Sequence, residues 1–110
     1  MGVDLTFGTN VDVVLADPYD WRELAPESAD VIVAGQTFEH TEFSWETMRQ
    51  LGRTLKNNSL CCIIVPSSGP EHRFPIDCWR MYPDGLRAID ALEWMDVIPD
   101  NPDLALVSRT

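Results

Sequence analysis

The chain has 110 residues, of which 45% are hydrophobic and 24% charged, a composition typical of one soluble globular domain with a single core. Its net charge of −10 excludes a nucleic-acid backbone as the main partner, because phosphate binding needs a basic face. No apolar run is long enough for a membrane span, and no basic and then apolar leader begins the chain, so we expect a cytoplasmic protein without membrane contact.

Four short apolar runs predict strands in the first two thirds of the chain. They are residues 3–5, 11–16, 31–34 and 60–65. The second run ends at Asp17-Pro18, because proline lacks the N–H that a strand ladder needs. Continuous apolar runs of this kind are typical of parallel strands that are covered on both faces.

A helix is predicted between the third and fourth strands. Apolar residues recur there at spacings of three and four and form one stripe that we expect to be core: Trp45, Met48, Leu51 and Leu55. Ser44 is a suitable N-cap, and Asn57-Asn58 can supply the left-handed residue that ends a helix.

A second helix is predicted to begin at Tyr82-Pro83-Asp84, since proline suits the first helical position. Its apolar stripe is Leu86, Ile89, Leu92 and Met95. The run DLALV after Pro102 predicts a last strand. The alternation of strands and helices favours an α/β fold with a mostly parallel sheet and helices on both faces.

Five segments in this order resemble class I S-adenosylmethionine-dependent methyltransferases, and most closely a small bacterial branch of them. They are GVDL, VDVVLADPYDW, ADVIVAGQTFEH, RTLKNNSLCCIIVPSS and GPEHRFPIDCWRMYPDG, and the similarity extends to about Met95. The resemblance implies an incomplete Rossmann-like methyltransferase sheet. Residues 1–110 would form one truncated domain that lacks the family's first strand and glycine-rich loop.

The resemblance also implies a cofactor side, with S-adenosylmethionine as a possible cofactor. Asp4 matches the acidic residue that accepts the ribose hydroxyls, and Asp17 matches the one that accepts from the adenine amino group. Because Pro18 has no N–H, Tyr19 would have to supply the adenine donor. Gln36 lies on the loop that would line the cofactor. The alternative is that both aspartates are solvated carboxylates at strand ends.

On the acceptor side, the resemblance implies a substrate pocket formed by two loops. Its candidate residues are Glu39, His72, Arg73 and Asp77, with His40 as the catalytic base. Two other interpretations stay open: a shared site for a metal or a base at the two histidines, and loop histidines held by neighbouring backbone. We favour the second and expect no metal site. The loop of His72 could equally be a buried anchor in which Arg73 pairs with Asp77.

The family's absent first strand would lie between the strands at residues 2–5 and 31–34. Three outcomes are open: these strands pair directly, a second copy of the chain fills the gap, or the chain is a fragment of a longer protein. We favour a homodimer or higher oligomer.

Two functions therefore remain. The first is a methyltransferase-like protein with weak or lost transfer to an unidentified, possibly small-molecule, acceptor. The second is a non-catalytic assembly protein that uses the half-domain as an oligomeric scaffold.

Overall fold

The computed structural model describes residues 1–89, 94–100 and 103–109, with side chains described as far as residue 89. Its elements in chain order are β1 (Val3–Asp4), β2 (Val13–Val14), β3 (Ala29–Gly35), the 3₁₀ helix η1 (Phe38–His40), α1 (Ser44–Thr54), β4 (Leu55–Pro66), α2 (Pro83–Ile89), β5 (Trp94–Asp100) and β6 (Asp103–Arg109). No helix among these residues is long and apolar enough to cross a bilayer.

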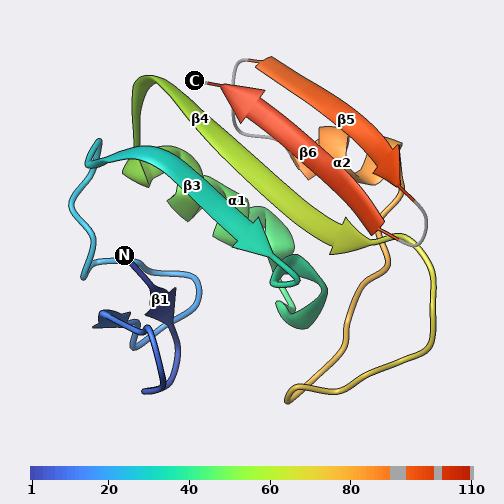
Figure 1. Ribbon diagram of the computed structural model, residues 1–110, viewed down its shortest axis with the longest axis horizontal. Coiled ribbons are helices and arrows are strands. Elements are labelled where there is room, and N and C mark those ends of the chain that lie inside the picture. The colour runs from blue at the N-terminus through green and yellow to red at the C-terminus, as the bar shows by residue number, and fades with distance from the viewer. Residues whose placement is uncertain (90–93, 101–102, 110) are drawn as a thin grey trace.

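The described strands form two separate sheets (Figure 1). β1 and β2 pair in parallel as a small two-stranded sheet. The larger sheet has the order β3-β4-β6-β5, in which β3 and β4 are parallel and β6 runs antiparallel to both of its neighbours. The predicted parallel pairing is therefore present in the N-terminal strands, while the C-terminal hairpin makes the larger sheet mixed.

Direct pairing between residues 2–5 and 31–34, one of the three outcomes left open, does not occur in the part of the chain that the structure describes. β3 pairs with β4 alone, and β1 pairs with β2. One of the three outcomes expected for the absent strand is thereby removed.

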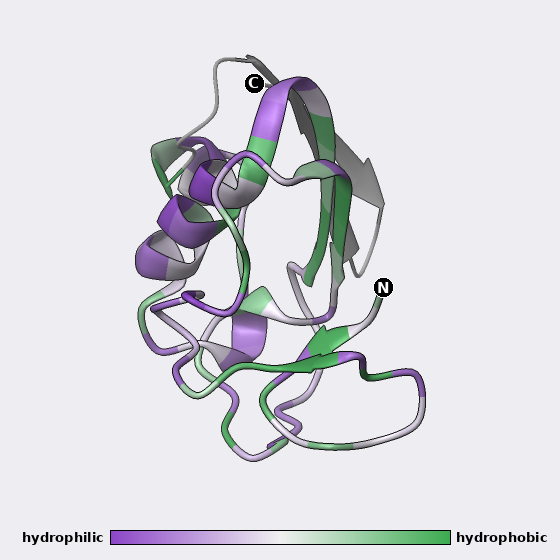
Figure 2. Cartoon of the chain, turned by 90° about the vertical axis from the view of Figure 1, so that its left-hand side faces the viewer, coloured by the Kyte–Doolittle hydropathy of each residue, from purple (hydrophilic) through white to green (hydrophobic). Residues whose placement is uncertain are grey.

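Both helices lie behind the same face of the larger sheet (Figures 1 and 2). Met48 and Leu51 of α1 and Leu86 of α2 share one buried cluster with Ile63 and Val65 of β4. These are the inward positions of the strand, since side chains alternate between faces along β4. Burial of this apolar surface is the main stabilising contribution to the fold.

The opposite face of the sheet is bare in the described residues. Val31 and Val33 of β3 are 61% and 67% exposed, and Leu60 of β4 is 46% exposed. Helices on both faces were predicted, and the described helices cover one. The strands do carry apolar residues on both faces, as the prediction assumed, but no described element packs on these outward-facing positions.

Four local predictions about the helices are wrong. Ser44 is the first residue of α1 and caps nothing, because Phe43 takes the N-cap position. Trp45 is 45% exposed, so it is not part of the core. The helix ends before Asn57-Asn58, since Leu55 is already extended; Asn58 does take a left-handed conformation, but within β4. Met95 lies in β5, and Leu92 lies outside the described residues.

Candidate functional site

A short turn after β3 positions Glu39 and His40, the two residues at the centre of the candidate site. Gln36 follows the last strand residue in a left-handed conformation, with φ of 53°, and its N–H donates to the carbonyl of Ile64, 2.9 Å away. The chain then enters η1, which is anchored by the fully buried Phe38. Glu39 and His40 follow directly, so the strand end fixes where they lie.

Glu39 is fully buried, and neither oxygen of its carboxylate has a hydrogen-bond partner among the described residues. Loss of hydration raises the pKa of this carboxyl above its ordinary value, although its own backbone and the nearby His40, His72 and Arg80 counteract part of the effect. A buried carboxylate without a donor is destabilising in a folded protein, and its position therefore calls for a partner.

His40 is oriented by the backbone of a distant loop. Its Nδ1 lies 2.6 Å from the carbonyl oxygen of Ile76, so this nitrogen carries the proton and donates it. In the neutral ring Nε2 then carries the lone pair, and this nitrogen lies 3.4 Å from Oε1 of Glu39. The ring of His72 stands edge-on to that of His40, with centroids 4.9 Å apart. The two histidines that the sequence left as separate loop residues are therefore neighbours.

Hydrogen bonds connect the loop that carries His72 to η1 and also close the loop on itself. The N–H groups of Cys78 and Trp79 donate to the carbonyl of Glu39 at 2.7 and 3.2 Å. The N–H of His72 donates to Asp77 at 2.7 Å, which closes the loop behind the histidine. These bonds hold the loop in place before any ligand is present.

The predicted ion pair between Arg73 and Asp77 is wrong. Asp77 instead accepts two hydrogen bonds from Arg80, at 2.7 and 2.8 Å, and this guanidinium holds the pKa of the carboxyl well below its usual range. Arg80 also donates to the carbonyl of Pro70. Arg73 is exposed and makes no hydrogen bond or ion pair that the structure describes. No local pattern marks this pair, because Asp77 and Arg80 lie in an irregular loop, where a spacing of three residues does not by itself bring side chains together.

The predicted cofactor residues lie on the small N-terminal sheet. Asp4 ends β1 and is exposed, with Oδ1 2.6 Å from the N–H of Leu5. Asp17 is also exposed and follows β2. Because β1 and β2 are parallel, their carboxyl ends lie at one edge of the sheet, as the resemblance requires.

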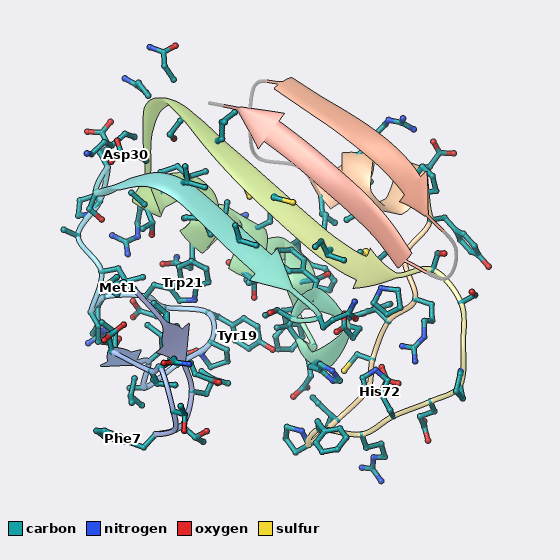
Figure 3. The ribbon with its side chains drawn as sticks, in the orientation of Figure 1. Met1, Phe7, Tyr19, Trp21, Asp30 and His72 are labelled. Carbon is teal, nitrogen blue, oxygen red and sulfur yellow. The ribbon has the colours of Figure 1, made fainter. Side chains whose placement is uncertain are left out.

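Tyr19 does not offer the adenine donor that its position predicted. Its N–H donates to Oδ1 of Asp17 at 2.8 Å, so the two groups expected to bind adenine are bonded to each other. Its hydroxyl instead accepts from the N–H groups of Glu42 and Phe43, at 2.9 and 3.3 Å. Tyr19 reaches from the N-terminal segment toward the start of α1 and connects the two parts of the chain (Figure 3).

An apolar groove of about 630 Å³ lies beside the start of α1 and was not predicted. Trp45, Trp79 and Tyr82 supply its aromatic walls, and Ile89 of α2 extends it. The indole N–H of Trp79 donates to the carbonyls of Thr41 and Glu42, at 2.9 and 3.1 Å, which fixes the ring at the mouth of the groove. The groove is marked by the exposure of two tryptophans, Trp45 on α1 and Trp79 on the loop.

The described residues fit one half of S-adenosylmethionine. Asp4 ends β1 and Asp17 lies three residues beyond β2, and carboxylates accept the hydroxyl and amino hydrogens of an adenosine. Among the residues that the structure describes, no glycine-rich loop stands beside them for the amino-acid half.

Comparison with solved structures identifies the fold. The chain is similar to an S-adenosylmethionine-dependent methyltransferase from Archaeoglobus fulgidus, with a TM-score of 0.75 and 14% identity over 99% of this chain and 75% of the other. It is also similar to the 1,6-didemethyltoxoflavin-N1-methyltransferase of Burkholderia thailandensis, solved with bound 1,6-didemethyltoxoflavin and S-adenosylhomocysteine, with a TM-score of 0.67 and 14% identity over 98% of this chain and 59% of the other. An S-adenosylmethionine-dependent methyltransferase from Aquifex aeolicus is similar with a TM-score of 0.60 and 16% identity, over 91% of this chain and 55% of the other.

The fold is therefore that of the class I S-adenosylmethionine-dependent methyltransferases, in an incomplete Rossmann-like form, as the resemblance predicted. The sequence itself matches no protein-family profile and no curated protein. At these identities the similarity establishes the architecture and leaves the activity open.

Proposed function

We propose that this chain is a methyltransferase-like protein that binds S-adenosylmethionine weakly through its adenosine half. The observation that carries the proposal is the similarity of fold over almost the whole chain, including one neighbour solved with S-adenosylhomocysteine. The parallel pairing of β1 and β2 supports it, because Asp4 ends β1 and Asp17 follows the carboxyl end of β2 by three residues. When bound, the cofactor supplies an electrophilic methyl group.

In this proposal Asp4 accepts the two ribose hydroxyls, and Asp17 accepts the adenine amino group. Asp17 must release or share the N–H of Tyr19 to do so, which lowers the net gain on binding. With no described group for the amino-acid half, we expect weak affinity and weak or lost methyl transfer. The acceptor is a small molecule or another group that the sequence does not identify.

His40 is the base that the geometry favours for the acceptor. Its Nδ1 is committed to Ile76, so the Nε2 lone pair is free to take a proton. The carboxyl of Glu39, 3.4 Å away, would stabilise the resulting imidazolium. His72, Arg73 and Asp77 lie on the loop that faces His40. Asp77 orders this loop by accepting from the N–H of His72, and the exposed side chains of His72 and Arg73 are available to a substrate.

Calorimetric titration with S-adenosylhomocysteine tests the proposal. We expect a measurable affinity that Asp4→Ala and Asp17→Ala each weaken about 10-fold or more, because a hydrogen bond to a charged group contributes about 1.5–3 kcal/mol. Asp30→Ala is the matched control, since Asp30 is exposed and pairs with Lys56 at the other end of β3. No heat and no thermal shift at millimolar ligand would show that the fold has lost the cofactor.

A second candidate function is assembly, and a different observation favours it. Val31, Val33 and Leu60 form an exposed apolar face, and one edge of β3 pairs with no strand that the structure describes; a second copy of the chain can cover both. We expect a homodimer in light scattering after size-exclusion chromatography. Val31→Lys with Val33→Lys should give a monomer, whereas a wild-type monomer at micromolar concentration would contradict the assembly role.

A further inference from the structure

Three side chains at the end of β3 and on the facing loop form a cluster that the proposed methyl transfer does not explain. One ligand atom from each of Glu39, His40 and His72 can be chosen so that all three lie within 4.8 Å of one another. Among the residues that the structure describes, this is the group of His, Cys, Asp and Glu side chains with the spacing of a metal site. Two imidazoles and one carboxylate are ligands that divalent transition metals prefer.

We propose that Glu39, His40 and His72 bind one divalent transition-metal ion, with zinc as the simplest occupant. The buried carboxylate of Glu39 is the independent observation that points to a ligand. It is fully buried, faces the histidines and has no hydrogen-bond donor. A cation at this position would neutralise the carboxylate and replace the favourable hydration that this group lost on folding.

The separation of two of the ligands already suits a metal. Two bonds of about 2.1 Å at a tetrahedral angle place ligand atoms about 3.4 Å apart. Nε2 of His40 and Oε1 of Glu39 are 3.4 Å apart. His72 is exposed, and a modest rotation of its ring would complete a three-ligand site.

The surrounding hydrogen bonds present these ligands in the form that a metal needs. The carbonyl of Ile76 holds the proton of His40 on Nδ1, which leaves Nε2 as the donor atom, an arrangement common behind metal-bound histidines. The backbone of the same loop is bonded to Glu39 through Cys78 and Trp79. Three protein ligands leave a coordination position open for water or an acceptor oxygen.

Metal binding would change the role of His40. With the lone pair of Nε2 on the metal, His40 cannot accept a proton, and the metal instead would lower the pKa of a hydroxyl in the open position. The metal proposal does not depend on cofactor binding. Zinc titrations without nucleoside and S-adenosylhomocysteine titrations in EDTA therefore separate the failure of one proposal from that of the other.

The test is titration of the full chain with Zn²⁺ alone, followed by Co²⁺ absorption as a spectroscopic signature. We expect one ion per chain, and at least about 10-fold weaker binding for His72→Ala and Glu39→Gln, since loss of an outer partner alone costs 10- to 100-fold. The matched control Glu46→Gln, on a carboxylate that pairs with Arg49 on α1, should leave the affinity unchanged.

Cys78→Ala is the second control, because Cys78 is an exposed thiol that could bind zinc by itself. It should bind as the wild type does. The proposal is overturned if no ion binds at pH 7.5, if His72→Ala binds as tightly as the wild type, or if Cys78→Ala abolishes binding. His72 is exposed, so loss of binding in His72→Ala does not reflect unfolding; circular dichroism confirms the fold of each variant.

Discussion

The N-terminal unit, residues 1–20, and the cluster around η1 differ in how firmly the fold holds their candidate side chains. In the N-terminal unit the one buried apolar side chain described is Leu15, which lies outside the main core cluster. Around η1, Phe38 and Glu39 are fully buried, and the facing loop is bonded to their backbone. The cluster is thus fixed by tertiary contacts, whereas Asp4 and Asp17 lie on a small sheet with little core of its own.

The largest expected difference between the two regions concerns their buried leucines. Leu51→Ala removes a fully buried side chain from the main cluster and should lower the free energy of unfolding by about 2–5 kcal/mol. Leu15→Ala removes the same atoms from the N-terminal unit and should cost less than half as much. Urea unfolding of both variants measures the difference, and equal losses would show that the two regions unfold as one body.

Two carboxyls around η1 should give opposite pH dependences of stability. Burial raises the pKa of Glu39, so its stabilising contribution is full below the unfolded value near 4.5 and is lost as the pH rises through the folded pKa. Arg80 lowers the pKa of Asp77, so that contribution is present above the unfolded value near 3.8 and is lost as the pH falls.

In EDTA, Glu39→Gln should therefore stabilise the protein at pH 7, and the gain should disappear at pH 4. Asp77→Asn should destabilise it at pH 7, and more than at pH 3. Thermal unfolding between pH 3 and 8 checks both. A stability loss at pH 7 in metal-free Glu39→Gln would refute the assigned desolvation of that carboxylate.

The connection between the two regions is a smaller effect. Tyr19→Phe removes the hydroxyl that accepts from the N–H groups of Glu42 and Phe43, and should cost about 0.5–1.5 kcal/mol. Hydrogen exchange at these two amides should become faster, while the amide of Ile63 in β4 should keep its rate. Faster exchange throughout the core would mean that Tyr19 supports more than the link.

The smallest global effect is expected at Gly2. A Cβ at this position would overlap the carbonyl of Asn10, so Gly2→Ala should disrupt the pairing of β1 and β2. Because local opening of this unit leaves the main core intact, the global unfolding midpoint should hardly move. Exchange of the Asp12 amide, which donates to the Gly2 carbonyl, reports the local loss; an equal shift of the global midpoint would contradict this separation.

Much of the architecture could be predicted because it follows from local patterns. The apolar runs gave β3 and β4, and the spacing of Met48 and Leu51 gave α1 and its buried face. The predicted last strand is β6. Boundaries were less accurate: Ser44 was predicted as the N-cap of α1 and is its first helical residue, because local sequence locates helix ends only to within one or two residues.

The candidate site was predicted only in part. Glu39, His40 and His72 were identified as polar residues after apolar strands, but sequence could not show that the two histidines lie together. Arg73 was assigned to Asp77 within the same loop, but sequence alone could not show that the folded loop presents Arg80 to this carboxylate instead. Tyr19 was given a cofactor role, and its N–H is bonded to Asp17 instead.

The sequence by itself determined that the segments of β3, α1, β4 and β6 are strands and a helix, since side-chain periodicity is a local property of the chain. Only the tertiary structure decided that Ile76 orients His40, that Glu39 is buried without a donor, and that both described helices share one face of the sheet. Such contacts join residues far apart in the chain, and their energies depend on packing and on the exclusion of water, which no local pattern contains.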